Sequence, residues 1–327
     1  MAGSCASFWQ VCVRERVLWG LVWFFHPVLL HATAPSGPVA IARPSGLYAM
    51  DPCFKNGTCP ALPAFVDGVY VRVNWDQIQP LSPTEYNWSR VDRALLSARA
   101  ANKRLQIGVW PGIASPRWLY DNLGAPHFPM RWNLHWGPPN CSVVRTPLPW
   151  DPVFLTAWGH FVSKLGERYD HESDVVAVQV AGIDAQTMEQ LLPTKTAEGC
   201  PGASDPAVTW AAKGYTPRRI ESAWERIIGF YQKAFTRTSL ILMTGPWGFP
   251  GVDNQGRVTG VDDKNLTVKL MKQFMDRVGV EVGGLQDNGA SAFWAWTPPS
   301  GLPAETVFGV QAYGHVTNDT GCMMVSA

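Results

Sequence analysis

The feature that most constrains the fold is a regular alternation between short apolar runs and longer segments with helical periodicity. The runs consist largely of Val, Ile and Leu along their whole length, which is typical of strands in a sheet that is covered on both faces. They are residues 46–50, 68–73, 104–110, 175–182, 239–244, 280–285 and 306–311. The alternation predicts an α/β protein with a parallel sheet.

Four segments between these runs carry apolar residues on one helical stripe. They are residues 89–101, 151–169, 217–235 and 264–277. We expect Ser89 to cap the first helix and Thr216 to cap the third, which opens with Pro217. The helices are expected to lie outside the sheet.

The connections after the third and fourth runs are long and rich in Trp, Pro, Gly and Cys, whereas the connections that enter the runs are short. In a TIM barrel this asymmetry marks the C-terminal face, where ligands bind. Since one barrel takes about 250 residues, we predict a single TIM (β/α)8 barrel in residues 35–327. The runs supply one strand fewer than the barrel needs. Three explanations remain open: the barrel is incomplete at its C-terminus, residues 293–296 form the missing strand, or residues 39–41 pair at the seam.

Residues 1–34 resemble an export segment. Arg14 and Arg16 precede an apolar run over residues 17–30, and residues 32–34 read Ala-Thr-Ala, a pattern that signal peptidase recognises. The run is shorter than the roughly 20 apolar residues that a membrane span needs. A cleaved signal peptide with secretion or export to a periplasm is therefore expected. A retained signal anchor is the alternative, and no other membrane contact is expected.

Cysteine usage agrees with export. Beyond the leader the cysteines are Cys53, Cys59, Cys141, Cys200 and Cys322. Cys53 and Cys59 could close a short local turn, and Cys141 with Cys200 is the expected second disulfide. Cys322 is then left without a partner.

Charge and motifs exclude several classes of function. A net charge of +1 with 16% charged residues gives no electrostatic bias toward nucleic acid. The sequence has no Gly-x-Gly-x-x-Gly after a strand, no P-loop, no nucleophile elbow and no close Cys/His pairing of the zinc type. We therefore expect no cofactor and no metal.

An ordered set of short motifs follows the first strands. The set comprises residues 75–80 (Trp-Asp-Gln-Ile-Gln-Pro), 86–89 (Tyr-Asn-Trp-Ser), 110–119 (Trp-Pro-Gly-Ile-Ala-Ser-Pro-Arg-Trp-Leu), 149–152 (Pro-Trp-Asp-Pro) and 168–170 (Arg-Tyr-Asp). Over roughly residues 45–245 the chain thereby resembles the glycoside hydrolases of clan A, especially the family 42 β-galactosidases and their uncharacterised relatives. It departs from their pattern in having Gln79 for Glu and Asn87 for Asp. The resemblance implies a TIM barrel that hydrolyses β-linked oligo- or polysaccharide.

In that clan the fourth strand ends in the general acid/base, commonly as Asn-Glu, because the leaving oxygen must receive a proton. This chain has no Asn-Glu there. Glu189 is the first candidate, since the Thr-x-Glu-x-x-Leu-Pro loop around it resembles that of the uncharacterised relatives, and Asp184 is the reserve. The alternative for each is a loop carboxylate that is solvated or caps a helix.

The second carboxylate is less evident. A retaining enzyme needs a nucleophile about 5 Å from the acid, normally a Glu at the end of the seventh strand. Here the late strands end in Gln286-Asp287 and in Gln311. Asp287 is the candidate nucleophile or base, whereas Gln286 and Gln311 could only hydrogen-bond sugar hydroxyls.

The chain contains 16 Trp, and indole faces stack well on sugar rings. The candidates for substrate stacking are Trp75, Trp110, Trp118 and Trp136, with packing in the core as the alternative. The resulting hypothesis is an O-glycosyl hydrolase that uses carboxylate acid/base catalysis. The alternatives are a carbohydrate-binding pseudoenzyme without the nucleophile and a truncated barrel fragment.

Overall fold

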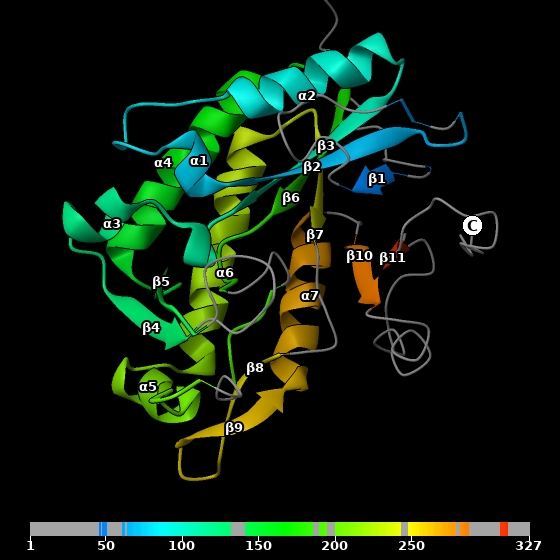
Figure 1. Cartoon of the computed structure of the whole chain (residues 1–327). Coiled ribbons are helices and arrows are strands. Elements are labelled where there is room, and N and C mark those ends of the chain that lie inside the picture. The colour runs from blue at the N-terminus through cyan, green and yellow to red at the C-terminus, as the bar shows by residue number, and fades with distance from the viewer. Residues whose placement is uncertain are drawn as a thin grey trace, which may run out of the picture. The chain divides into compact units, whose positions relative to one another are not determined.

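The central feature is a five-stranded sheet in which every pair of neighbouring strands is parallel (Figure 1). In spatial order the strands are β1 (Tyr48–Met50), β2 (Gly68–Asn74), β3 (Arg104–Trp110), β6 (Val175–Val180) and β7 (Ser239–Leu242). Their spatial order is also their order along the chain, as in the wall of a (β/α)8 barrel. The predicted α/β class is therefore confirmed.

The computed structural model describes residues 46, 48–50, 61–62, 64–131, 141–185, 190–194, 200–242, 248–278, 282–287 and 308–312. The last two ranges are described by their backbone alone. The leader predicted at residues 1–34 lies outside the described residues, as do the candidate strands at residues 293–296 and 39–41. Residues 40–327 cluster as one unit by their internal contacts.

A second parallel pair continues the barrel pattern. β10 (Val282–Asp287) pairs with β11 (Phe308–Ala312), and β10 contacts β7. Every strand predicted from the sequence is thus present. The fold is an α/β barrel that is incomplete over the described residues.

The two faces of the sheet differ in what they bury. Val69, Val71 and Val73 of β2 belong to the large apolar core with the helices. Tyr70, between them, packs in a separate cluster with Tyr48 and Trp110. Side chains of successive strand residues point to opposite faces, so the second cluster marks the face turned away from the helices.

The long helices match the predicted ones: α2 (Ser89–Ala100), α4 (Pro152–Tyr169), α6 (Pro217–Ala234) and α7 (Lys264–Val278). α4 packs on α6 and α6 on α7, side by side along the sheet (Figure 1). The Thr216 side chain accepts from the backbone N–H of Arg219 at 3.2 Å, which confirms it as the N-cap. The prediction for Ser89 was wrong by one residue: Trp88 is the N-cap, and the Ser89 N–H donates to Asn87 Oδ1 at 3.2 Å.

Shorter elements that the sequence did not predict fill the connections after the strands. They are α1 (Trp75–Ile78), the 3-10 turn η1 (Gly112–Ala114), α3 (Arg117–Asp121), β4 (His127–Arg131), β5 (Val143–Pro147), α5 (Pro206–Ala212), β8 (Phe249–Val252) and β9 (Val258–Asp263). β4 pairs with β5 and β8 with β9, both antiparallel. These insertions account for the length of the connections.

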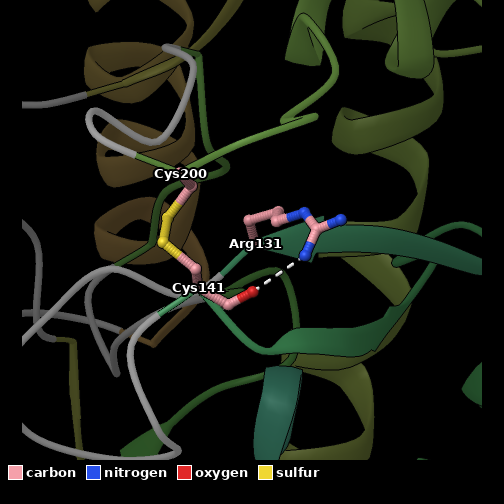
Figure 2. Close-up of a disulfide and its surroundings, with 3 residues drawn as sticks. All are labelled: Arg131, Cys141 and Cys200. Atoms are coloured by element: carbon pink, nitrogen blue, oxygen red, sulfur yellow. Dashed lines mark hydrogen bonds between the residues drawn. A yellow bond between two sulfur atoms is a disulfide. The ribbon is translucent and has the colours of Figure 1, made fainter.

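The predicted disulfide between Cys141 and Cys200 is confirmed (Figure 2). It joins the connection after β3 to the connection after β6. Beside it, Arg131 Nη1 donates to the Cys141 carbonyl at 3.0 Å. Cys53, Cys59 and Cys322 lie outside the described residues. Within the described part of the chain, no helix combines the length and apolar character needed to cross a membrane.

Candidate functional site

The candidate site is the edge at which β2, β3 and β6 end. Asn74, the last residue of β2, is paired with Trp110, the last residue of β3. Just beyond Trp110, the Ile113 N–H of η1 donates to the carbonyl of Ala185, which follows β6, at 3.0 Å. The carboxyl ends of these strands therefore adjoin, and in parallel α/β proteins ligands bind at this edge.

Asp184 lies at this edge and is buried, with 2% of its surface exposed. Its Oδ1 accepts from the backbone N–H of Gly182 at 2.6 Å, which closes a tight turn directly after β6. Burial raises the pKa of Tyr231, and the negative charge of Asp184 raises it further. Asp184 thus has a structural function in this turn, where it is neither solvated nor a helix cap, and its chemical role stays a prediction.

Two glycines allow close approaches here, Gly182 to helix side chains and Gly112 to the backbone after β6. Gly182 has φ +142°, and a Cβ on it would lie 2.8 Å from Ile227 Cδ1. Gly112 has φ +44°, and a Cβ on it would lie 2.3 Å from the carbonyl oxygen of Ala185. The turn that carries Asp184 is therefore held tightly against η1.

The remaining candidate acids are only partly located. Glu189 lies outside the described residues. Asp287 is the last residue of β10, and Gln286 is in register with Gln311 of β11. Their backbone positions, at or near the ends of the late strands, agree with the sequence analysis. The roles of these side chains stay predictions, as does the distance between the two candidate acids.

Trp75 and Trp118 lie in the core. Trp75 is 0% exposed, and its ring packs edge-on against Trp118 at 5.6 Å and Trp158 at 5.0 Å between ring centroids. Trp118 is 3% exposed, and its Nε1 donates to the backbone carbonyl of Gln79 at 2.8 Å. Neither ring has an open face for a sugar in this structure, because other side chains cover both. The core alternative therefore describes these two residues better than substrate stacking does.

Trp110 differs from them because its side chain is only partly buried and lies at the end of β3. It packs against Tyr70 on the face turned away from the helices. The Tyr70 hydroxyl on that face donates to Gln179 Oε1 of β6. Of the stacking candidates, Trp110 has the position best suited to contact a ligand, whereas Trp136 lies outside the described residues.

Gln79, which replaces the Glu of the resembled family, is an internal hydrogen-bonding residue. Its Oε1 accepts from Trp75 Nε1 at 2.6 Å, and its Nε2 donates to the carbonyl of Pro83 at 2.8 Å. A carboxylate could accept the first hydrogen bond but could not donate the second. The local structure therefore accounts for an amide at this position.

The structure also identifies an acid that the sequence analysis overlooked. Asp76 follows the end of β2 by two residues, and its Oδ1 is buried without a hydrogen-bond partner in the described structure. Burial raises the pKa of Asp76 and the backbone N–H of Gln77 lowers it in part, so that the resulting value is about 6. The position of Asp76 just after the end of a predicted strand could have identified it from the sequence.

A cavity of about 290 Å³ lies elsewhere, beside the start of β3. Its lining is Ala61, Leu62, Val69, Ser97, Ala98, Ala100, Ala101 and Lys103. The Lys103 ammonium donates to the carbonyls of Ala64 and Val66. The charged group of this lining is therefore already hydrogen-bonded within the protein. This cavity is remote from the strand ends that carry the candidate acids. Among the side chains that the structure describes, no group of three or more His, Cys, Asp or Glu residues is placed to hold a metal ion.

The fold defines the class, an α/β barrel-type protein with its candidate acids at the carboxyl ends of the strands. No family model and no curated protein matches the sequence. Solved structures with similar folds include a β-galactosidase from the psychrophilic Marinomonas ef1, at 12% identity and a TM-score of 0.40 over 68% of this chain. They also include the catalytic domain of a β-amylase from Paenibacillus polymyxa, at 11% identity and a TM-score of 0.46 over 74% of each chain.

A third similar structure is the xylanase XynB from Paenibacillus barcinonensis, at 13% identity and a TM-score of 0.36 over 68% of this chain and 53% of the xylanase. The match covers 36% of the β-galactosidase, so this chain corresponds to about a third of that protein. These structures are glycoside hydrolases by name. Similarity at this level assigns neither a family nor an activity to this chain.

Proposed function

We propose that this protein is a glycoside hydrolase that acts on β-linked carbohydrate through a pair of carboxyl groups at the carboxyl edge of the barrel. The observation that carries the proposal is the convergence of β2, β3 and β6, which brings the partly exposed Trp110 and the acids Asp76 and Asp184 to one edge. The motifs over residues 45–245, including the resemblance to family 42, support the same activity.

In the proposed mechanism Glu189 gives its proton to the glycosidic oxygen as the bond from that oxygen to the anomeric carbon breaks. In one route Asp287 attacks the anomeric carbon as that bond breaks; water, deprotonated by Glu189, then hydrolyses the glycosyl–Asp287 ester and restores both carboxyl groups. In the other route Asp287 takes a proton from a water molecule that attacks the anomeric carbon directly. A separation of about 5 Å between the two carboxyl groups would give retention, and about 6.5–9.5 Å would give inversion. Trp110 is the proposed stacking platform, and Gln286 and Gln311 are proposed to bind sugar hydroxyls.

The test is hydrolysis of aryl β-glycosides by the full chain and by Glu189→Gln and Asp287→Asn. Each change is expected to lower kcat by a factor of about 100 or more, since it removes a proton-transfer group or a nucleophile. Glu172→Gln, in an exposed ion pair with Arg99, is the matched control and should leave kcat unchanged. Full activity in both active-site variants would refute the assignment of these acids.

The second candidate is a carbohydrate-binding protein without hydrolytic activity. It is favoured by the glutamines at positions 286 and 311, since the late strands end without a Glu. Oligosaccharide binding with no release of product from any aryl glycoside would support it over the enzyme.

We also propose export of the chain with residues 1–34 as signal peptide or signal anchor, leaving residues 35–327 as the barrel domain. The disulfide between Cys141 and Cys200 supports this, because disulfides persist in oxidising compartments. N-terminal sequencing of the mature protein tests it: a start near residue 35 is expected after cleavage.

A further inference from the structure

The further inference concerns Asp76, the second residue of α1. The preceding strand ends at Asn74, which is paired with Trp110 of β3. Asp76 thus lies just beyond the carboxyl end of β2, at the edge to which β6 brings Asp184. This placement puts it where a barrel protein binds its ligand.

The residues around Asp76 have structural functions, whereas the one interaction that the described structure gives the Asp76 carboxyl group is with the backbone N–H of Gln77. Trp75 and Ile78 are buried in the core, and the Gln77 side chain accepts from the backbone N–H of Asn74 at 3.3 Å. Asp76 Oδ1 is buried and has no hydrogen-bond partner within the described structure. An unsatisfied buried acceptor opposes folding, so its presence calls for a functional explanation.

Asp76 is nevertheless within reach of a ligand, because the residue as a whole keeps part of its surface exposed. α1 packs against β2, α2, α3 and α4. The ionisable side chains on these elements include Arg72 of β2, Arg90 and Asp92 of α2, Arg117 and Asp121 of α3, and His160, Lys164 and Glu167 of α4. Arg90 Nη1 donates to Gln77 Oε1 at 3.0 Å rather than to Asp76. None of these side chains contributes to the shift in the pKa of Asp76. Burial raises this pKa, the Gln77 N–H lowers it in part, and the resulting value is about 6. Asp76 is therefore largely protonated in weakly acidic solution and ionised above neutrality.

We propose that Asp76 is a substrate-binding residue whose protonated carboxyl group donates a hydrogen bond to an acceptor oxygen of the bound carbohydrate. Ring and glycosidic oxygens of a sugar carry no proton, so they can be bound only by a donor. The ionised carboxylate is an acceptor and would repel the same oxygen. The inference rests on the proposed function and adds to it a residue that controls the pH dependence of binding.

The experiment measures the dissociation constants of soluble β-linked gluco-, galacto- and xylo-oligosaccharides by calorimetry at about pH 5 and about pH 8, on either side of the Asp76 pKa. Wild-type protein is expected to bind at least one of them roughly tenfold more weakly at the higher pH, a change of about 1.4 kcal/mol. Asp76→Asn keeps a donor and cannot ionise. It should bind equally at both pH values and about as tightly as wild type at the lower one. Asp76→Ala should bind weakly at both.

Asp253→Asn is the control, because Asp253 is a carboxylate in the exposed turn between β8 and β9 that pairs with Arg257. It should keep the wild-type pH dependence. The inference is overturned if Asp76→Asn also keeps the wild-type pH dependence, or if the wild-type constant is the same at both pH values. Such a result leaves the proposed function standing, since carbohydrate is still bound. If no oligosaccharide binds to wild type at either pH, both proposals fail.

Discussion

The indole nitrogen of Trp75 donates to the side-chain oxygen of Gln79 at 2.6 Å, and the amide of Gln79 donates in turn to the carbonyl of Pro83. Gln79 is 2% exposed and Trp75 is fully buried. This chain of hydrogen bonds holds the loop after α1 against the core, and it depends on an amide at position 79.

Gln79→Glu is therefore expected to lower the free energy of unfolding by about 1–3 kcal/mol at neutral pH, because a buried carboxylate faces the Pro83 carbonyl without a proton to donate. The loss should shrink as the pH falls, since the protonated acid regains a donor. Urea unfolding at two pH values measures both effects. Gln77→Glu is the control: Gln77 Oε1 only accepts, from the Asn74 N–H and from Arg90, so this change should have little effect.

Asp170 predicts a pH-dependent stability. Its two carboxylate oxygens accept from the backbone N–H groups of Thr236, Arg237 and Thr238, each at 3.0 Å, just before β7. Burial raises the pKa of Asp170, but these hydrogen bonds outweigh it and hold the pKa below its ordinary value. The stabilisation is therefore present above the ordinary pKa of about 4 and is lost as the pH falls through the lower folded-state value.

Asp170→Asn should accordingly cost about 1–3 kcal/mol at neutral pH, and the difference from wild type should shrink in strong acid. Thermal unfolding over a pH series tests this. Asp121→Asn, which breaks an exposed ion pair with Arg145, should cost less than about 1 kcal/mol. A pH-independent loss in Asp170→Asn would contradict the assignment.

Gly112→Ala tests the close approach between η1 and the turn that carries Asp184. The new methyl group would lie 2.3 Å from the Ala185 carbonyl oxygen, and the backbone is left-handed at φ +44°. We expect a loss of roughly 2–5 kcal/mol, the sum of about 1–2 for the backbone and about 1–3 for overpacking. Gly256→Ala separates the backbone cost from the overpacking cost, because Gly256 has φ +76° but no atom within 4 Å of the added carbon. Equal losses in the two variants would show that the contact is absent.

Replacing both Cys141 and Cys200 by Ser should lower the free energy of unfolding by about 2–4 kcal/mol, since the disulfide closes a long loop in the unfolded chain. The two cysteines are 59 residues apart in sequence. Chemical denaturation of the oxidised protein and of the variant measures the difference. A disulfide-linked peptide pair found by mass spectrometry in the wild type is the required control.

The regular part of the fold was predictable because its signals are local. Runs such as residues 104–110 and helices such as residues 217–235 repeat their apolar pattern over enough residues to be recognised. The insertions were not predictable in the same way, since β4 and β8 are short and contain Pro129 and Pro250, which are unusual in strands.

The candidate site was predictable in outline but not in its side chains. The ends of the strands indicated the edge, and Asp184 lies there as expected. Nothing in the local pattern shows whether a Trp after a strand faces solvent or the core. The sequence therefore offers Trp75 and Trp118 as stacking candidates, although packing against residues distant in sequence buries them. Asp76 was overlooked because the absence of a hydrogen-bond partner is a property of the assembled structure.

The cross-link shown in Figure 2 has a consequence for engineering this protein. The connections that it joins also meet where the ring of Phe128 stacks on that of Trp210, with 3.9 Å between centroids. A graft that exchanges either connection alone would leave one cysteine and one aromatic face without a counterpart. New specificities should therefore be built by transplanting both connections together.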